Sequence, residues 1–236
     1  MIQLAIETSS IHPSAALGRD GQILDTWRSD QPRAHAASLI SSLSDLCRSN
    51  KVNPEEIQCV MVSIGPGSFT GLRIGVTVAR TMSLAAARTG REIALVAVPS
   101  LHAVGCNALS APEPPEELAV IADAKRNRVF ATRLRREGDA YVEIKQACEI
   151  EPQKLFAECG PHAAVIGEGV EQHREAVEKA GLHILSEDLW RPRAESVFLL
   201  GCELATRGAL TPTRELVPMY VRRPEAEERW EERNRA

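Results

Sequence analysis

The stretch SIGPGSFTGLRIGVTVAR, residues 63–80, decides the fold of the first half of this chain. An apolar run over residues 57–64 ends in the turn Gly65-Pro66-Gly67, and a long apolar segment follows Gly71. This order predicts a buried strand, a tight turn and then a helix. Glycine-rich turns at helix starts often bind phosphate through free backbone amides. The first question is therefore whether this turn binds a nucleotide.

The spacing of the turn excludes three familiar active loops. A Walker A loop has lysine directly after its last glycine, but no lysine follows Gly71. The dinucleotide fingerprint G-x-G-x-x-G fails at Thr70, and a G-x-S-x-G nucleophile elbow fails because Gly67 directly precedes Ser68. Contact with an anion at the helix start is still open, with Gly67, Ser68 and Arg73 as the candidate residues.

Small residues recur every four positions along the predicted helix. A glycine inside a helix costs about 1 kcal/mol relative to alanine, so Gly75 requires a reason such as a closely packed backbone. Either the protein's own sheet or a helix from a second chain would provide one, and the sequence does not choose between them. The stripe consists of Gly71, Gly75, Ala79, Ser83 and Ala87.

The order of elements occurs twice along the chain. The first half predicts a strand, a hairpin, a helix, a strand and a helix at residues 2–8, 14–27, 33–48, 57–64 and 69–88, followed by a strand at 92–98. After the prolines of SAPEPPEE, the same order is predicted at 118–123, 128–147, 152–159, 163–167 and 170–180. We therefore predict a duplicated α/β fold, with an N-terminal subdomain over residues 1–110 and a C-terminal one over residues 111–236.

Three further predictions concern the ends of elements. Asn53-Pro54-Glu55-Glu56 is a typical helix start. A last helix is expected over residues 192–208, where it can pack back on the N-terminal half, and a charged, solvated helix over residues 225–235. Glu7 and Asp123 end the first strands of the two halves, which makes them candidate carboxylates for a metal–phosphate site. No further acid follows Glu7 in TSSIHPS.

Composition excludes several classes of function. The net charge is −4, from 28 basic and 32 acidic residues, so general nucleic-acid binding is disfavoured. A local basic region at residues 125–136 leaves direct RNA contact open. None of the six cysteines forms a C-x-x-C pair and no two histidines are four residues apart, so we expect reduced thiols and no metal site. No apolar run is long enough to cross a membrane.

Six stretches, in this order, resemble the bacterial TsaB/YeaZ family, which carries a Gcp-like (peptidase M22-like) domain. They are LAIETSS (4–10), RAHAASLISSL (33–43), GPGSFTGLRIG (65–75), VPSLHAV (98–104), ADAKRNRVFATRL (122–134) and PMYVRRP (218–224). GPGSFTGLRIG is highly specific, and the resemblance covers nearly the whole chain.

The resemblance implies a duplicated actin-like (ASKHA, ribonuclease-H-like) fold and a cytoplasmic protein without a cofactor. It also implies a non-catalytic dimerisation subunit that acts with a TsaD-type catalytic paralogue and a TsaE-type ATPase. Together these proteins make the threonylcarbamoyl modification on the adenosine beside the tRNA anticodon, so tRNA is reached through the complex. Alone, the chain would form a homodimer.

Within this resemblance, the chain departs from the catalytic paralogue at the metal site. The two histidines of the paralogue's His-x-x-x-His pair align with Ser100 and Val104. Valine cannot ligate a metal, which favours a scaffold. The alternative from the same fold is an ATP-dependent small-molecule kinase or a metallopeptidase.

The resemblance also assigns the small-residue stripe to a partner interface. In this family the two helices corresponding to residues 34–48 and 70–87 form a helical bundle with the paralogue or with a second copy. The implied interface residues are His35, Leu39, Leu43, Leu46, Phe69, Gly71, Gly75, Val78, Ala79 and Met82.

Overall fold

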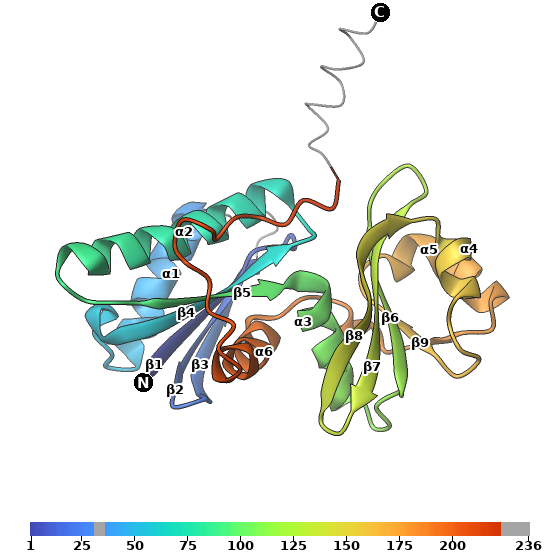
Figure 1. The fold of residues 1–236 in the computed structure, drawn as a ribbon, viewed down its shortest axis with the longest axis horizontal. Helices are drawn as coiled ribbons and strands as arrows, with labels where there is room; N and C mark the ends of the chain where they lie inside the picture. The colour runs from blue at the N-terminus through green and yellow to red at the C-terminus, as the bar shows by residue number, and fades with distance from the viewer. Residues whose placement is uncertain (31–35, 223–236) are drawn as a thin grey trace, which may run out of the picture.

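The computed structural model describes residues 1–30 and 36–222 of the chain. Two five-stranded sheets lie side by side, each with its own helices (Figure 1). His35 and the helix predicted over residues 225–235 lie outside the described residues.

The first sheet has the strand order β3-β2-β1-β4-β5. β1 pairs antiparallel with β2 and parallel with β4, so Leu4 lies between Leu17 and Val60. β2 and β3 form the predicted hairpin, and β5 adds a parallel strand beyond β4. The strands are β1 (Ile2–Glu7), β2 (Ser14–Arg19), β3 (Gln22–Arg28), β4 (Ile57–Gly65) and β5 (Ala94–Pro99).

The second sheet repeats this topology. Its order is β10-β9-β6-β7-β8, with β6 antiparallel to β7 and parallel to β9. Read from the hairpin edge, strand for strand, the two sheets are the same, which confirms the predicted duplicated α/β fold. The strands are β6 (Glu117–Asp123), β7 (Val129–Glu137), β8 (Ala140–Ile150), β9 (Ala164–Ile166) and β10 (His183–Ile184).

Helices cover both faces of the first sheet. α1 (Ala36–Ser49) and α2 (Phe69–Arg88) pack on one face, over alternate residues of β1 such as Leu4 and Ile6. α6 (Ala194–Thr206) packs on the other face, where the Phe198 ring meets the apolar side chains of β1, β2 and β4. The last described helix thus returns to the N-terminal half (Figure 1).

The second sheet is covered by α4 (Pro152–Ala157) and α5 (Val170–Lys179). A short helix, α3 (Ser100–Cys106), lies between the halves and contacts β5, β6, β7, β8 and α6 (Figure 1). The sequence analysis did not predict α3, the 3-10 turns η2 (Asn107–Ser110) and η3 (Glu187–Leu189), or β10. The helix start predicted at Asn53 is only the 3-10 turn η1 (Pro54–Glu56), because β4 begins at the next residue.

The small-residue stripe of α2 packs inside the chain. A Cβ added to Gly71 would lie 1.9 Å from the Thr8 carbonyl oxygen, and one added to Gly75 would lie 2.4 Å from Thr8 Oγ1. Ala79 is fully buried in the same core. Four of the five residues of the stripe are therefore buried within this chain, and Ala87 is exposed. The assignment of Gly71, Gly75 and Ala79 to a partner interface is corrected.

The same correction applies to three leucines of α1. Leu39, Leu43 and Leu46 are buried against the first sheet, with exposed fractions of 0%, 8% and 4%. Their side chains serve the core of this chain, as amphipathic helices in globular proteins usually do.

Replacing Gly71 by alanine tests the close approach of α2. Alanine normally stabilises a helix relative to glycine, by about 1 kcal/mol. Here the new methyl group would meet backbone, so we expect a loss of about 2 kcal/mol or more in the free energy of unfolding, measured by urea denaturation. Thr77→Ala, at an exposed position of the same helix, is the control and should be neutral or slightly stabilising. A stabilising Gly71→Ala would contradict the packing described here.

Candidate functional site: the cleft between the halves

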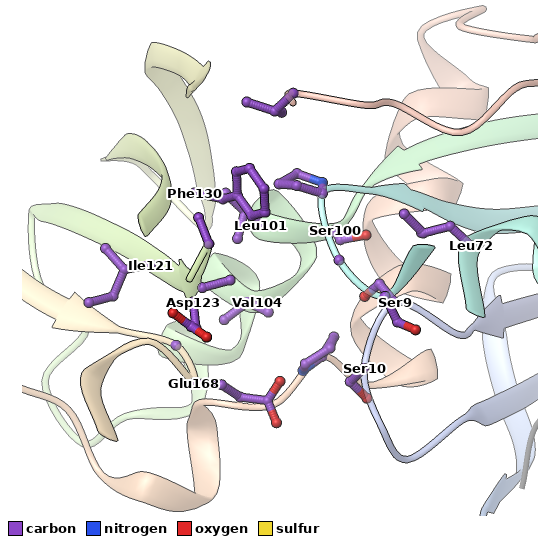
Figure 2. A pocket seen from close by; sticks show the side chains of 18 of the residues that line it. Ser9, Ser10, Leu72, Ser100, Leu101, Val104, Ile121, Asp123, Phe130 and Glu168 are labelled. Atoms are coloured by element: carbon purple, nitrogen blue, oxygen red, sulfur yellow. The ribbon is translucent and has the colours of Figure 1, made fainter. Parts of the chain in front are cut away.

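A cleft of about 990 Å³ lies between the two halves. Ser9, Ser10 and Leu72 line it from the first half, and Asp123 and Glu168 from the second, as Figure 2 shows. α3 contributes Ser100, Leu101 and Val104, and polar and apolar side chains are mixed along the lining (Figure 2).

The turn after β4 is hydrogen-bonded to two other segments that line the cleft, at Ser9 and at Ser100. The Ser68 N–H donates to the Ser9 carbonyl at 2.7 Å, and the Gly65 N–H donates to Ser100 Oγ at 3.0 Å. Ser68 Oγ accepts from the Gly71 N–H at 3.3 Å and so caps α2. These bonds hold the glycine turn as one wall of the cleft.

The three candidate anion residues all line this cleft, but two already have structural partners. Gly67 is exposed, Ser68 caps the helix, and Arg73 is stacked. The Arg73 guanidinium carbon lies 3.9 Å from the centre of the Phe69 ring, and its Nε donates to Tyr220 Oη at 3.0 Å. An arginine over an aromatic face in this way makes a cation–π contact.

Tyr220 belongs to a segment that connects the two halves. The Met219 N–H donates to the Ile64 carbonyl at 2.7 Å, and Arg222 Nη1 donates to the Ala124 carbonyl at 3.2 Å. The Tyr220 and Phe69 rings are 5.1 Å apart and 40% and 37% exposed. The sequence analysis did not assign Tyr220 to a site; its only signal was the stretch PMYVRRP.

The opposite side of the cleft carries a basic turn. Lys125, Arg126 and Asn127 all have positive φ angles, of 61°, 51° and 56°. Asp123 Oδ1 accepts from the Lys125 N–H at 2.9 Å and supports this turn. On the same side, burial raises the pKa of Glu168, whose carboxylate lies 3.7 Å from Arg191 Nε.

The two candidate carboxylates do not form a pair. Asp123 is exposed in the cleft, whereas Glu7 is fully buried beneath it and is not part of its lining. Glu7 Oε1 accepts from Ser9 Oγ at 2.6 Å, and Oε2 has no partner among the described residues. Burial raises the pKa of Glu7, and hydrogen bonds from Ser9 lower it by a smaller amount.

The positions that align with the paralogue's metal ligands are part of the packing. Ser100 is buried and bonded to the glycine turn, and Val104 is buried in the core of the second half. His102, between them, lies with Nε2 2.6 Å from the Tyr141 carbonyl oxygen. Within residues 1–30 and 36–222, no three His, Cys, Asp or Glu side chains are grouped as metal ligands.

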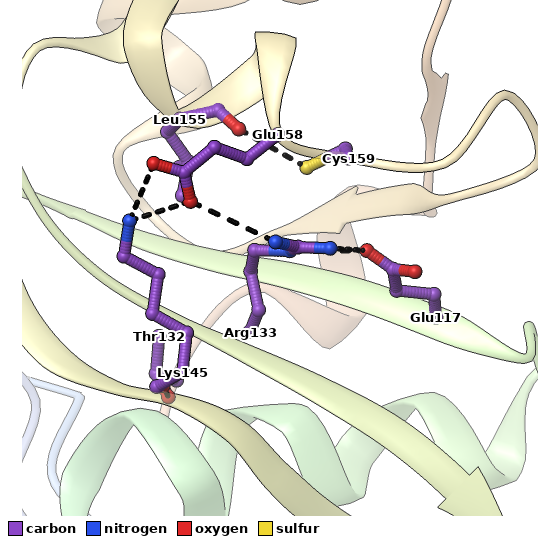
Figure 3. Close-up of polar contacts among 7 residues, drawn as sticks. All are labelled: Glu117, Thr132, Arg133, Lys145, Leu155, Glu158 and Cys159. Atoms are coloured by element: carbon purple, nitrogen blue, oxygen red, sulfur yellow. Dashed lines mark hydrogen bonds and ion pairs between the residues drawn. The ribbon is translucent and has the colours of Figure 1, made fainter.

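The basic region 125–136 is divided by ion pairs. Figure 3 shows Arg133 between Glu117 and Glu158, with distances of 3.0 Å from Nε to Glu117 Oε1 and 3.7 Å from Nη1 to Glu158 Oε2. Arg128 pairs with Glu149 at 2.8 Å. The region is therefore no single basic patch. Lys125 and Arg126 face the cleft, whereas Arg135 and Arg136 lie exposed toward the end of β7.

Two sheets of the same strand order with a cleft between them define a duplicated α/β protein. The chain belongs to the TsaD family, tRNA N6-adenosine threonylcarbamoyltransferase, whose model matches residues 29–230.

Relatives within this family confirm the resemblance to TsaB/YeaZ. The chain is 25% identical to the tRNA threonylcarbamoyladenosine biosynthesis protein TsaB of Escherichia coli, over 93% of this chain and 94% of that protein. It is 24% identical to the protein of that name from Bacillus subtilis, over 98% of each. The structure of YeaZ from Pseudomonas aeruginosa has the same fold, with a TM-score of 0.79 at 22% identity, over 93% of this chain and 99% of that one.

No helix in the part of the chain that the structure describes is both long and apolar enough to cross a membrane.

The buried Glu7 predicts a pH dependence of stability. Its pKa is raised in the folded state, so the folded protein holds this proton at a pH where the unfolded chain has lost it. The free energy of unfolding therefore falls as pH rises above about 4.5, the ordinary value, until the folded-state pKa is passed, at up to about 1.4 kcal/mol per pH unit. The substitution Glu7→Gln removes this pH-dependent contribution to the free energy of unfolding.

We expect the difference in stability between Glu7→Gln and wild type to grow, in favour of the variant, as pH rises from 4.5. Urea unfolding at a series of pH values measures it. Glu171→Gln, which removes an exposed carboxyl of the cleft, is the matched control and should run parallel to wild type. Parallel curves for Glu7→Gln would contradict the prediction.

Proposed function

We propose that this chain is a TsaB-type, non-catalytic subunit of the complex that forms threonylcarbamoyladenosine in tRNA. Its partners in this proposal are a TsaD-type catalytic paralogue and a TsaE-type ATPase. Full-length similarity to TsaB proteins supports membership in this pathway.

One observation carries the non-catalytic role. The two positions that align with the paralogue's metal ligands hold Ser100 and Val104, and both residues line the cleft. Ser100 Oγ accepts a hydrogen bond from the Gly65 N–H, and the Val104 side chain has no atom that could ligate a metal. The residues that would hold the paralogue's metal are thus used here for packing.

The outer flank of α2 is the surface that we assign to the partner. Ile74, Val78 and Met82 follow each other at four-residue spacing, and each is partly exposed beside the core. On α1, Ile40 is 52% exposed. An apolar flank on two neighbouring helices suits a helical bundle with the TsaD-type protein. A homodimer would use the same flank on both copies and compete with this complex.

Phe69 does not belong to this flank. It precedes Val78 by nine residues, which places the two side chains about 180° apart around the helix. Phe69 lines the cleft, and its assignment to the partner interface stays a prediction.

Charged substitutions on the outer flank test the interface. Met82→Asp and Val78→Asp should weaken binding to the TsaD-type protein by at least about 100-fold, because a desolvated carboxylate would face an apolar partner. Isothermal titration calorimetry measures the affinity. Thr77→Asp, adjacent on the same helix and exposed, is the control. Affinities within twofold of wild type for both flank variants would refute this interface.

The role in the reaction is tested by reconstitution. With tRNA, ATP and threonylcarbamoyl adenylate, the chain alone should form no modified adenosine above background. Adding the TsaD-type and TsaE-type proteins should produce it, and omitting this chain should abolish it, as followed by mass spectrometry of digested tRNA. Turnover by the isolated chain, or stoichiometric zinc or iron in it, would contradict the proposal.

A further inference from the structure

A second, smaller pocket lies next to the cleft, and we name it the side pocket. It encloses about 190 Å³ and shares two residues with the lining of the cleft, Pro192 and Ser10, the second of which is labelled in Figure 2. Its other residues come from the loop after β1, the end of β3 and the segment before α6. They are His12, Arg28, Ser29, Asp30 and Arg191.

Hydrogen bonds within the chain hold the backbone on both sides of the side pocket. The Ser29 N–H donates to the Pro13 carbonyl at 2.9 Å, which ties the end of β3 to the loop after β1. His12 Nδ1 donates to the Ser29 carbonyl at 3.1 Å and holds the imidazole in place. On the other side, Asn107 Nδ2 donates to the Arg191 carbonyl at 2.8 Å. The lining residues are therefore attached to a fixed frame.

Two guanidinium groups give the side pocket its positive charge. Arg28 is exposed, and its guanidinium has no hydrogen bond or ion pair with any residue that the structure describes. Arg191 Nε lies 3.7 Å from Glu168 Oε1, a long ion pair, and the Nη atoms of Arg191 have no partner among residues 1–30 and 36–222. A guanidinium stays charged and can donate two parallel hydrogen bonds to an oxyanion. Both arginines therefore bring unused donors to the side pocket.

A buried hydroxyl adds a third donor. Ser10 is only 5% exposed, and its Oγ has two contacts, with the N–H and with the carbonyl of His12, both at 3.3 Å. Hydrogen bonds of a hydroxyl to oxygen are usually about 2.7–2.8 Å long. The hydroxyl of Ser10 can therefore turn toward a stronger acceptor in the side pocket at little cost.

The charge of the lining selects an anion. Among the described residues that line the side pocket, Asp30 is the one acid, against two arginines, whereas the whole chain has a net charge of −4. An apolar ligand would desolvate both guanidinium groups without replacing their hydrogen bonds. A carboxylate presents two oxygens in one plane, which one guanidinium satisfies. A phosphate group has enough oxygens for donors that come from three separate segments.

We propose that the side pocket binds a phosphate group, held by Arg28, Arg191 and the hydroxyl of Ser10. The bound group connects the loop after β1 and the end of β3 with the segment that leads into α6. Free phosphate and the backbone of tRNA both carry this group, and the experiment separates these two sources. The inference goes beyond the proposed function and does not depend on it.

The first test is a titration of the full wild-type chain with inorganic phosphate, followed by two-dimensional NMR of the backbone amides. Sodium chloride keeps the ionic strength constant. We expect saturable shifts, at millimolar phosphate, for amides in residues 9–14, 28–30 and 189–193, and none when chloride replaces phosphate. This measurement needs no variant, so it does not depend on how a variant folds.

Three substitutions then test the assigned groups. Arg28→Gln and Arg191→Gln should each weaken phosphate binding by about tenfold or more, the scale of one charged hydrogen bond. Asp30→Asn should tighten it by about threefold or more, because the carboxylate repels the anion. The matched control is Arg19→Gln, which removes an exposed cation at the other end of the same hairpin and should change the affinity less than twofold.

The source of the phosphate group follows from the same arginine variants in the assembled complex with the TsaD-type and TsaE-type proteins. Fluorescence anisotropy gives the affinity for unmodified tRNA. Weaker tRNA binding by Arg28→Gln and Arg191→Gln identifies the RNA backbone as the source. Unchanged tRNA binding, together with lost phosphate binding, identifies free phosphate. Both results support the site.

Three results would overturn the inference. They are no saturable shifts in the three segments, phosphate affinities within twofold of wild type for both arginine variants, and no gain in affinity for Asp30→Asn. The titration uses this chain alone, so a failure of the proposed complex to assemble leaves its result unchanged.

Discussion

The close approach of one loop to the end of one strand shapes each half of this protein. In the first half, Gly71 leaves no room for a side chain above the Thr8 carbonyl, and the loop before it is bonded to Ser9. In the second, a Cβ on Gly167 would lie 2.1 Å from the Ile121 carbonyl, and the Gly169 N–H donates to that carbonyl at 3.1 Å. The loop after the fourth strand of each sheet therefore presses on the first strand. The two walls of the cleft share this packing arrangement although the sequences of the two halves differ.

Periodicity predicted most elements because burial imposes it directly. Continuous apolar runs became β1, β4 and β6, and the order of strands and helices predicted the second sheet. The predictions were wrong where the surrounding structure, and not the local sequence pattern, determined the element. Asn53 caps the predicted start and forms a capping box with Glu56, but Ile57 already belongs to a strand, so the turn ends after three residues. α3 was missed because it lies between two halves and is apolar on most sides, which removes the amphipathic pattern.

The candidate site was predictable only in part, for a related reason. The glycine turn and the basic turn each carry local signals, and both line the cleft. Arg73 and Tyr220 are 147 residues apart, and nothing in either local sequence indicates their hydrogen bond. Likewise, the spacing of Gly71 and Gly75 shows that a backbone must lie close, but not whose backbone it is. The structure identifies Thr8 of the same chain, and so moves the stripe from the surface to the core.

This correction separates two surfaces of α2 that the sequence had merged. The helix is fixed along its glycine face, so its remaining flanks point in defined and different directions. Phe69 and Arg73 belong to the flank at the cleft, while Val78 and Met82 belong to the outer flank beside α1. The body of the helix lies between the outer flank and the residues that line the cleft. One 20-residue helix therefore separates the outer flank, which we propose as the partner surface, from the wall of the cleft.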